Sequence, residues 1–183
     1  KPEPSMRARD EIARLIRDAG LFDRLAPFNP AWVGSTYLDV HSGASDVDIC
    51  CSFLPGLAET ASAADAACGI YEAYARTEEV YGGQASRILR FRIGGQAFEV
   101  WGRAHPVEAH EFWKYTQAEV RLLNLFGDPL RDTVRHLKRA GHSTEQAFGR
   151  ALGRPGDAEA ALLEWFSQPD ALLQRLPFSC GSA

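Results

Sequence analysis

The sequence predicts an α+β fold, in which a small mixed β-sheet with flanking helices is followed by a helical C-terminal part. Short apolar segments of strand length are confined to the region before residue 105, and two of them flank a Gly-Gly pair. The residues that follow repeat their apolar side chains with the period of a helix. We therefore expect an α/β core over residues 6–104 and a helical part over residues 105–176, packed together as one compact unit.

The N-terminal elements follow from local patterns. A helix, a turn, a strand, a loop and a second strand are predicted, in that order, over residues 6–19, 28–30, 31–33, 36–45 and 47–53. Ser5 can cap the helix and Gly20 can end it. The second strand is almost continuously apolar, which is typical of a central strand that is covered on both faces.

The remaining elements are predicted in the same way. Residues 57–77 are rich in alanine and predict a helix. Residues 88–93 and 96–101 are expected to pair as a hairpin, because Gly94-Gly95 suits the positive φ angles of a two-residue turn. Further helices are predicted over residues 106–126, 129–140, 143–152 and 157–166.

The composition is that of an ordinary soluble globular protein, with 45% hydrophobic and 24% charged residues. A formal net charge of −4 argues against a non-specific nucleic-acid binder, but it leaves room for a local basic site. The four cysteines lack zinc-ligand spacing and are expected to be reduced, buried thiols. Because no apolar run is long enough for a membrane span or a signal peptide, we expect a cytoplasmic protein.

Asp46 and Asp48 are the most informative pair of side chains. Two acids at positions i and i+2 of a strand point to the same face. Two carboxylates at the start of an apolar strand repel each other and lose hydration, and a bound divalent cation removes both penalties. Mg²⁺ commonly takes one or two carboxylates together with water and substrate phosphates. The alternative is a structural role, in an ion pair or as a cap of the preceding loop.

Glu99 supplies a third acid on the second arm of the predicted hairpin. Three carboxylates can hold two metal ions, one of which activates the attacking oxygen while the other binds the leaving pyrophosphate. The alternative for Glu99 is a cross-strand ion pair with Arg90 or Arg92.

Gly34-Ser35 follows the first predicted strand and has the composition of a phosphate-binding turn. Glycine allows close approach of the backbone, and backbone N–H groups together with the serine hydroxyl can bind a terminal phosphate. The alternative is a plain turn.

Together, Gly34-Ser35, a ten-residue spacer, Asp46-x-Asp48 and the later Glu99 resemble the signature of DNA polymerase β-like nucleotidyltransferases. The resemblance implies the small mixed sheet of that superfamily. It also implies that Gly34 and Ser35 contact the triphosphate, and that the three acids bind the metal ions and carry catalysis.

A second resemblance covers about residues 20–165 and is to a little-characterised bacterial domain-of-unknown-function family within this superfamily. It includes the helical segments around Glu119 and Lys138, and it makes Lys138 a candidate nucleotide-binding residue. The chain departs from that pattern in ways that bear on acceptor or phosphate contacts, at Tyr115, Ser143, Asp39 and His41.

Four basic residues form a stripe on one predicted helix, at positions Arg131, Arg135, Lys138 and Arg139. Such a stripe can meet a triphosphate or a polyanionic acceptor, although a solvated helix face is the commoner explanation. Glu119 and Arg121 are equally compatible with an ion pair between or within helices and with a site.

These patterns predict a Mg²⁺-dependent nucleotidyltransferase, for which Mn²⁺ is an alternative cofactor. It would move a nucleoside monophosphate from a nucleoside triphosphate such as ATP to a hydroxyl of an unidentified small molecule, RNA end or protein. The alternative is a catalytically silent nucleotide-binding or regulatory module of the same fold. The helical part offers a surface for an oligomer, or a lid over the site.

Overall fold

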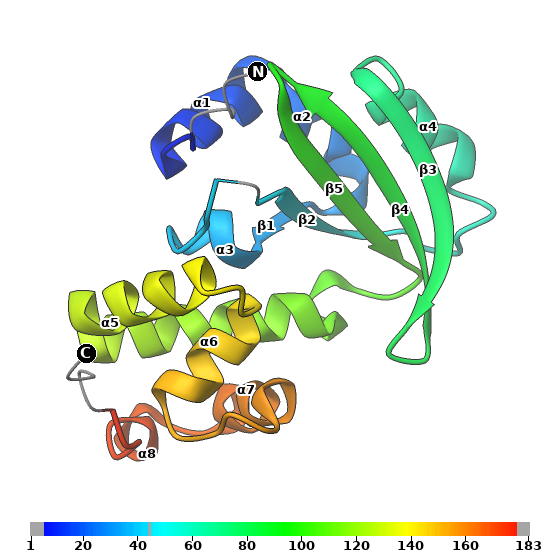
Figure 1. Ribbon diagram of the computed structural model, residues 1–183. Coiled ribbons are helices and arrows are strands. Elements are labelled where there is room, and N and C mark those ends of the chain that lie inside the picture. Colours follow the sequence, from blue (N-terminus) through cyan, green and yellow to red (C-terminus); the bar gives the residue numbers. More distant parts are fainter. Residues whose placement is uncertain (1–5, 44, 179–183) are drawn as a thin grey trace. The chain divides into compact units, whose positions relative to one another are not determined.

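The computed structural model describes residues 6–43 and 45–178. They form an α+β fold around a five-stranded sheet with the order β1-β2-β5-β4-β3 (Figure 1). The β2–β5 pair is parallel and the other neighbours are antiparallel, so the predicted mixed sheet is confirmed. The strands are β1 (Ala31–Val33), β2 (Val47–Ser52), β3 (Glu72–Tyr81), β4 (Gln84–Ile93) and β5 (Gln96–Arg103).

Eight α-helices and two short 3-10 helices accompany the sheet in the described part of the chain. The first group is α1 (Arg9–Asp18), α2 (Leu21–Leu25), η1 (Ala26–Phe28), α3 (Gly34–Tyr37) and α4 (Ala61–Cys68). The second group is η2 (Val107–Ala109), α5 (Glu111–Arg139), α6 (Thr144–Ala151), α7 (Ala158–Ser167) and α8 (Asp170–Leu173).

The described chain divides into two compact units. We call the first the sheet unit; it consists of the residues up to Tyr37 together with Gly43–Trp113. The second, the helical unit, consists of Leu38–Ser42 and the residues from Lys114 onward. The domain boundary that we expected between residues 104 and 105 stays a prediction.

The core of the sheet unit lies on one face of the sheet, where α1, α2 and α4 pack (Figure 1). Successive side chains of a strand point to opposite faces of the sheet, so every second side chain enters this core. The strand residues buried in this core are Val47, Ile49, Cys51, Leu89, Phe91, Phe98 and Val100. Because these positions are fixed, the residues between them must lie on the opposite face, and the predicted acids are among those residues.

The first helix matches its prediction at its C-terminus more closely than at its N-terminus. Gly20 ends it with a left-handed φ of 64°. The N-cap is Ala8, whose backbone N–H donates to the Glu11 carboxylate at 3.2 Å. Ser5, the expected cap, lies outside the described residues.

Hairpin turns join the last three strands. Gly94 and Gly95 have φ angles of 54° and 81° and connect β4 to β5, as predicted. A second turn, missed in the sequence, uses Gly82 and Gly83 with φ angles of 58° and 75° to connect β3 to β4. Both pairs have the positive φ angles that only glycine adopts at little cost.

The predicted helix over residues 57–77 is wrong in its second half. Only Ala61–Cys68 is helical, and β3 begins at Glu72. This edge strand is exposed along nearly its whole length, so it lacks the apolar alternation by which strands are recognised.

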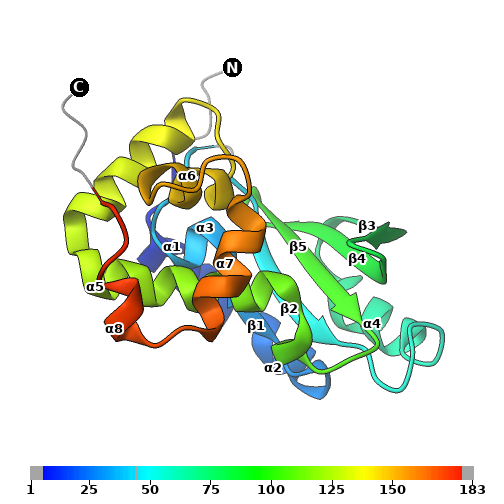
Figure 2. The same ribbon diagram turned by 90° about the horizontal axis from the view of Figure 1, so that it is seen from below.

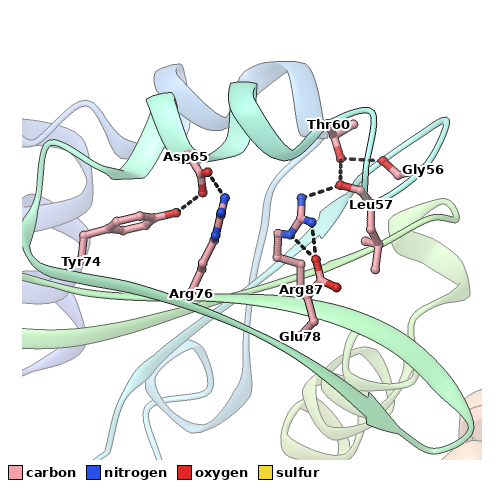
Figure 3. A network of polar contacts seen from close by, with 8 residues as sticks. All are labelled: Gly56, Leu57, Thr60, Asp65, Tyr74, Arg76, Glu78 and Arg87. Atoms are coloured by element: carbon pink, nitrogen blue, oxygen red, sulfur yellow. Dashed lines mark hydrogen bonds and ion pairs between the residues drawn. The ribbon is translucent and has the colours of Figure 1, made fainter.

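Polar and charged side chains connect β3 to α4 and to β4 (Figure 3). Asp65 of α4 accepts hydrogen bonds from the Tyr74 hydroxyl, at 2.5 Å, and from Arg76. Arg87 of β4 pairs with Glu78 and also donates to the carbonyl of Leu57. Backbone pairing with β4, which runs from Ala75 opposite Arg90 to Tyr81 opposite Gln84, holds this strand at the edge, and the polar side chains add to it.

The helical unit contains the predicted helices with corrected ends. The helix expected from Pro106 starts only at Glu111, after η2. Within α5, Gly127 has non-helical angles (φ 68°, ψ −156°), which separates the two helices that were predicted there. The helices α6 and α7 are confirmed, and α8 is an addition (Figure 2).

Arg121 joins the helices of this unit. Its guanidinium pairs with Asp170 at 2.7 Å and donates to the carbonyls of Phe166, at 3.2 Å, and Gln168. Of the two alternatives for Arg121, the structure therefore shows an ion pair between helices.

Two further expectations concern cysteines and membranes. Cys50, Cys51 and Cys68 are buried free thiols, and burial raises the pKa of Cys68 to about 12. Among residues 6–43 and 45–178, no helix has both the length and the apolar character needed to cross a membrane.

Candidate functional site

Strand register brings two of the predicted acids together. Asp48 of β2 and Glu99 of β5 are direct partners in the parallel pairing, so their side chains lie on the same face, opposite the core. Asp46 immediately precedes β2 and is exposed. The sheet unit thus places Asp46 and Asp48 at the beginning of β2 and Glu99 beside Asp48 in the register.

The pKa of Asp46 reports its surroundings. It is raised, first because the surrounding protein removes part of the water from the carboxyl group, and then by the negative charge of Glu99. Arg92 and Arg90 act in the opposite direction and lower the pKa. Two acids and two arginines therefore share one electrostatic neighbourhood on this face.

Gly34 stands against the carboxylate of Asp48. The antiparallel pairing of β1 and β2 places Val33 opposite Asp48, and Gly34 follows directly. A β-carbon added at residue 34 would lie 3.0 Å from Asp48 Oδ2, and φ is 77°. Both the close approach and the left-handed backbone require glycine at this position.

Ser35 is the second member of the predicted phosphate-binding pair. It lies in α3, a helical turn that replaces part of the loop expected over residues 36–45. Ser35 is 7% exposed, whereas Gly34 is half-buried. The backbone of Gly34 is therefore the more accessible part of the pair.

Glu99 has protein partners for both carboxylate oxygens. Arg90 Nε donates to Oε1 at 2.8 Å, and Trp101 Nε1 donates to Oε2 at 3.2 Å. The cross-strand ion pair that we kept as an alternative thus exists, with Arg90 as the partner. Arg92 instead donates to the carbonyl of Gly95 at 2.8 Å.

The acids fit a divalent cation in chemistry but not in their present conformation. Three carboxylates offer the hard oxygen ligands that Mg²⁺ and Mn²⁺ prefer. However, no three His, Cys, Asp or Glu side chains of the described residues converge closely enough to hold an ion. An ionised carboxylate has about four lone-pair sites, so Glu99 can still bind a cation, but Arg90 competes with the cation for Oε1.

Lys138 belongs to the helical unit, whereas the three acids belong to the sheet unit. Its Nζ donates to Thr144 Oγ1 at 3.0 Å. Its predicted contact with nucleotide stays a prediction.

Two other members of the basic stripe hold a segment of the helical unit. Arg131 donates to the carbonyl of Leu38, and Arg135 forms an ion pair with Asp39 at 2.8 Å. These arginines are therefore structural contacts rather than a fully solvated face.

Trp101 contacts the candidate site residue Glu99, a contact that is not predicted in the sequence analysis. It follows Glu99 by two positions in β5, so strand alternation alone places both side chains on one face. Its ring also packs against Phe112 and Tyr81, with centroids 5.1 and 5.9 Å away. The spacing of two residues between Glu99 and Trp101 could have predicted this contact, but Trp101 enters the sequence analysis only as an apolar strand residue.

Residues 14–165 match the family described as "Domain of unknown function (DUF4269)". The chain belongs to this family. The bacterial character that we expected of its relatives stays a prediction. No curated protein matches this DUF4269 chain in sequence.

Solved structures establish the fold of this DUF4269 chain. The GLD-2/RNP-8 complex aligns with a TM-score of 0.50 and 11% identity, over 84% of this chain and 74% of the other. The Cid1 RNA terminal uridylyl transferase aligns with a TM-score of 0.54 and 13% identity, over 79% and 46%. The Cid1 poly(U) polymerase with MgGTP bound also gives 0.54, at 11% identity, over 84% and 47%. The chain thus has the nucleotidyltransferase fold and spans just under half the length of the Cid1 chains.

Proposed function

We propose that the chain is a Mg²⁺-dependent nucleotidyltransferase, which moves a nucleoside monophosphate from a nucleoside triphosphate to a hydroxyl of an acceptor. The observation that carries the proposal is the position of Gly34 beside the paired acids. A methyl group there would meet Asp48 Oδ2 at 3.0 Å, and Asp48 lies in register with Glu99. Bare backbone next to paired carboxylates suits a triphosphate that is bound through a cation.

Asp46, Asp48 and Glu99 are the residues that would hold Mg²⁺, or Mn²⁺ in its place. When bound, such a cation neutralises charge on the phosphates and favours deprotonation of the attacking hydroxyl. Glu99 can also accept the proton of the acceptor hydroxyl, in competition with the hydrogen bonds that Arg90 and Trp101 donate to its oxygens.

The phosphates are assigned to the backbone at Gly34 and to Ser35, which would bind the β- and γ-phosphates. Lys138 of the helical unit is proposed as a further phosphate ligand. Proteins of the same fold hold magnesium nucleotides, since Cid1 structures contain MgATP and MgGTP. They support a magnesium nucleoside triphosphate as the donor, while a small molecule, an RNA end or a protein are the acceptor classes to be tested.

The proposal is tested by thermal unfolding with ATP, CTP, GTP or UTP, each with and without Mg²⁺. A nucleotide at a hundred times its dissociation constant adds about 2.7 kcal/mol to the stability, which corresponds to a shift of several degrees. We expect such a shift with at least one Mg²⁺-nucleotide, and its loss in Asp48→Asn. Asp23→Asn removes the same charge from an exposed position on α2 and should keep the shift. An equal shift in Asp48→Asn and wild type would contradict the proposed site.

A nucleotide-binding or regulatory module without turnover is the second candidate. One observation favours it: both oxygens of Glu99 are already engaged by Arg90 and Trp101. Release of pyrophosphate separates the two candidates, because only a transferase releases it. Nucleotide binding that persists without pyrophosphate release, across small-molecule, RNA and protein acceptors, would favour the silent module.

A further inference from the structure

Arg90 connects three neighbouring strands on the acid-bearing face. It lies opposite Glu99 in the β4–β5 register and donates to Glu99 through Nε at 2.8 Å. Its two terminal nitrogens turn to β3, where one donates to Thr77 Oγ1 at 2.8 Å and the other to Glu79 Oε1 at 3.5 Å. A single guanidinium therefore has one donor on the proposed metal ligand and two on the edge strand.

The pair between Arg90 and Glu99 is open to exchange. The side chains are 37% and 20% exposed, so water and ions can reach both partners. Ion pairs with this exposure contribute little to stability, because solvent screens them. A divalent cation carries twice the charge of the guanidinium and is a hard-oxygen binder, so it competes well for the same carboxylate.

We propose that Arg90 holds Glu99 in the metal-free protein and is replaced there by a divalent cation. Arg90 is then a positioning residue of the transferase, and this inference rests on the proposed function. Its contacts with Thr77 and Glu79 do not involve the site and can persist after the exchange. They would keep the released positive charge next to the acids, where it faces the anionic oxygens of a bound nucleotide or acceptor.

Arg92 offers a matched control. Like Arg90, it is an arginine of β4, and a spacing of two residues places both side chains on the same face of the strand. Unlike Arg90, it donates to the Gly95 carbonyl and makes no hydrogen bond or ion pair with Glu99 among the described residues. Arg90→Gln and Arg92→Gln therefore remove the same charge from the same neighbourhood, but only the first frees Glu99.

The experiment is a titration of the full chain with Mn²⁺ in the absence of nucleotide, in which electron paramagnetic resonance counts the free ion. We expect Arg90→Gln to bind Mn²⁺ about fivefold more tightly than wild type, the factor that corresponds to losing one exposed ion pair as a competitor. Arg92→Gln should change the affinity by clearly less, because it acts only through longer-range charge. Arg90→Lys, which keeps the charge but loses the planar fork, should fall between wild type and Arg90→Gln.

The outcomes separate this inference from the function on which it rests. If wild type binds Mn²⁺, Asp48→Asn abolishes binding, and Arg90→Gln matches Arg92→Gln or binds more weakly than wild type, the metal site stands and the exchange is wrong. If none of these proteins binds Mn²⁺, the metal site fails and the exchange fails with it. Binding by Arg90→Gln but not by wild type would support the exchange in its strongest form. Circular dichroism tests whether each variant is folded. If Arg90→Gln does not fold, the Mn²⁺ affinity of Arg90→Lys is compared with that of wild type instead.

Discussion

Gly34 shows how one missing side chain can define a site. Its φ is 77°, and a β-carbon added there would lie 3.0 Å from Asp48 Oδ2, which gives two separate reasons for glycine. The first reason is conformational and the second is contact with a proposed metal ligand, so substitution by alanine combines a backbone effect with a site effect.

Gly20→Ala separates the two effects. Gly20 has a φ of 64° but open space where a β-carbon would lie. We expect Gly34→Ala and Gly20→Ala each to lower the free energy of unfolding by about 1 kcal/mol, the usual cost of a left-handed non-glycine residue. Only Gly34→Ala should also abolish the Mg²⁺-nucleotide shift in thermal unfolding. Retention of that shift in Gly34→Ala would mean that the nucleotide does not approach residue 34.

At this scale the sequence located the acids because their chemistry is local. Asp46 and Asp48 are two residues apart, and Glu99 stands alone in an apolar strand. The choice between Arg90 and Arg92 as partner of Glu99 depended on hairpin register, which pairs Arg90 with Glu99 and Arg92 with Ala97. The sequence alone left that choice open.

At the scale of elements, strands were found where their burial is high. β2, β4 and β5 contribute to the core and agree with the prediction, whereas the exposed β3 begins within the segment for which the sequence predicts a helix. The stabilising contacts of β3 join residues such as Asp65 and Arg76, and a local pattern does not reveal that these pairs form. Hydrophobic periodicity detects burial, so it does not detect an edge strand whose side chains are exposed.

β5 also depends on a close contact at its C-terminal end. A β-carbon at Gly102 would lie 2.1 Å from the ring of Phe53, which is fully buried and packs against Phe28. Overpacking of this kind typically costs about 1–3 kcal/mol. We expect Gly102→Ala to lower the stability by at least this amount in urea denaturation.

Gly156→Ala is the control for that substitution. A β-carbon at Gly156 meets no atom within 4 Å, and its φ is not in the left-handed region. Its stability should stay close to that of wild type. If both variants lose the same stability, the tight contact with Phe53 does not limit β5.

At the scale of the whole molecule, the residues of the proposed site belong to the sheet unit, except for Lys138, which belongs to the helical unit. The acids, Gly34 and Ser35 all belong to the sheet unit. The short segment Leu38–Ser42, between Ser35 and Asp46, belongs to the helical unit. The sequence anticipated the β-rich first part and the helical second part. The segment Leu38–Ser42 belongs to the helical unit because of long-range contacts such as the ion pair between Arg135 and Asp39. Local sequence patterns do not predict such contacts.

The helical unit contains a group that should make stability depend on pH. Glu119 is 1% exposed, and its Oε1 has no hydrogen-bond partner among the described residues. Burial raises its pKa well above the ordinary value, and Glu145 adds to this, while Lys138 opposes it. A carboxyl whose folded pKa is raised stabilises the fold below its unfolded pKa, and this contribution is lost as the pH rises through the folded pKa.

Glu119→Gln tests this dependence, because the amide has nearly the same shape and stays neutral. Below about pH 4 the two proteins should be similarly stable, since Glu119 is then protonated in both the folded and unfolded states. Above it, wild type should lose stability relative to Glu119→Gln by at most about 1.4 kcal/mol per pH unit, up to the folded pKa. Urea denaturation at several pH values measures the difference, with the exposed Glu159→Gln as the charge-matched control on α7. A difference that does not grow with pH would show that Glu119 is ionised in the folded protein, as it would be if Lys138 compensated its charge.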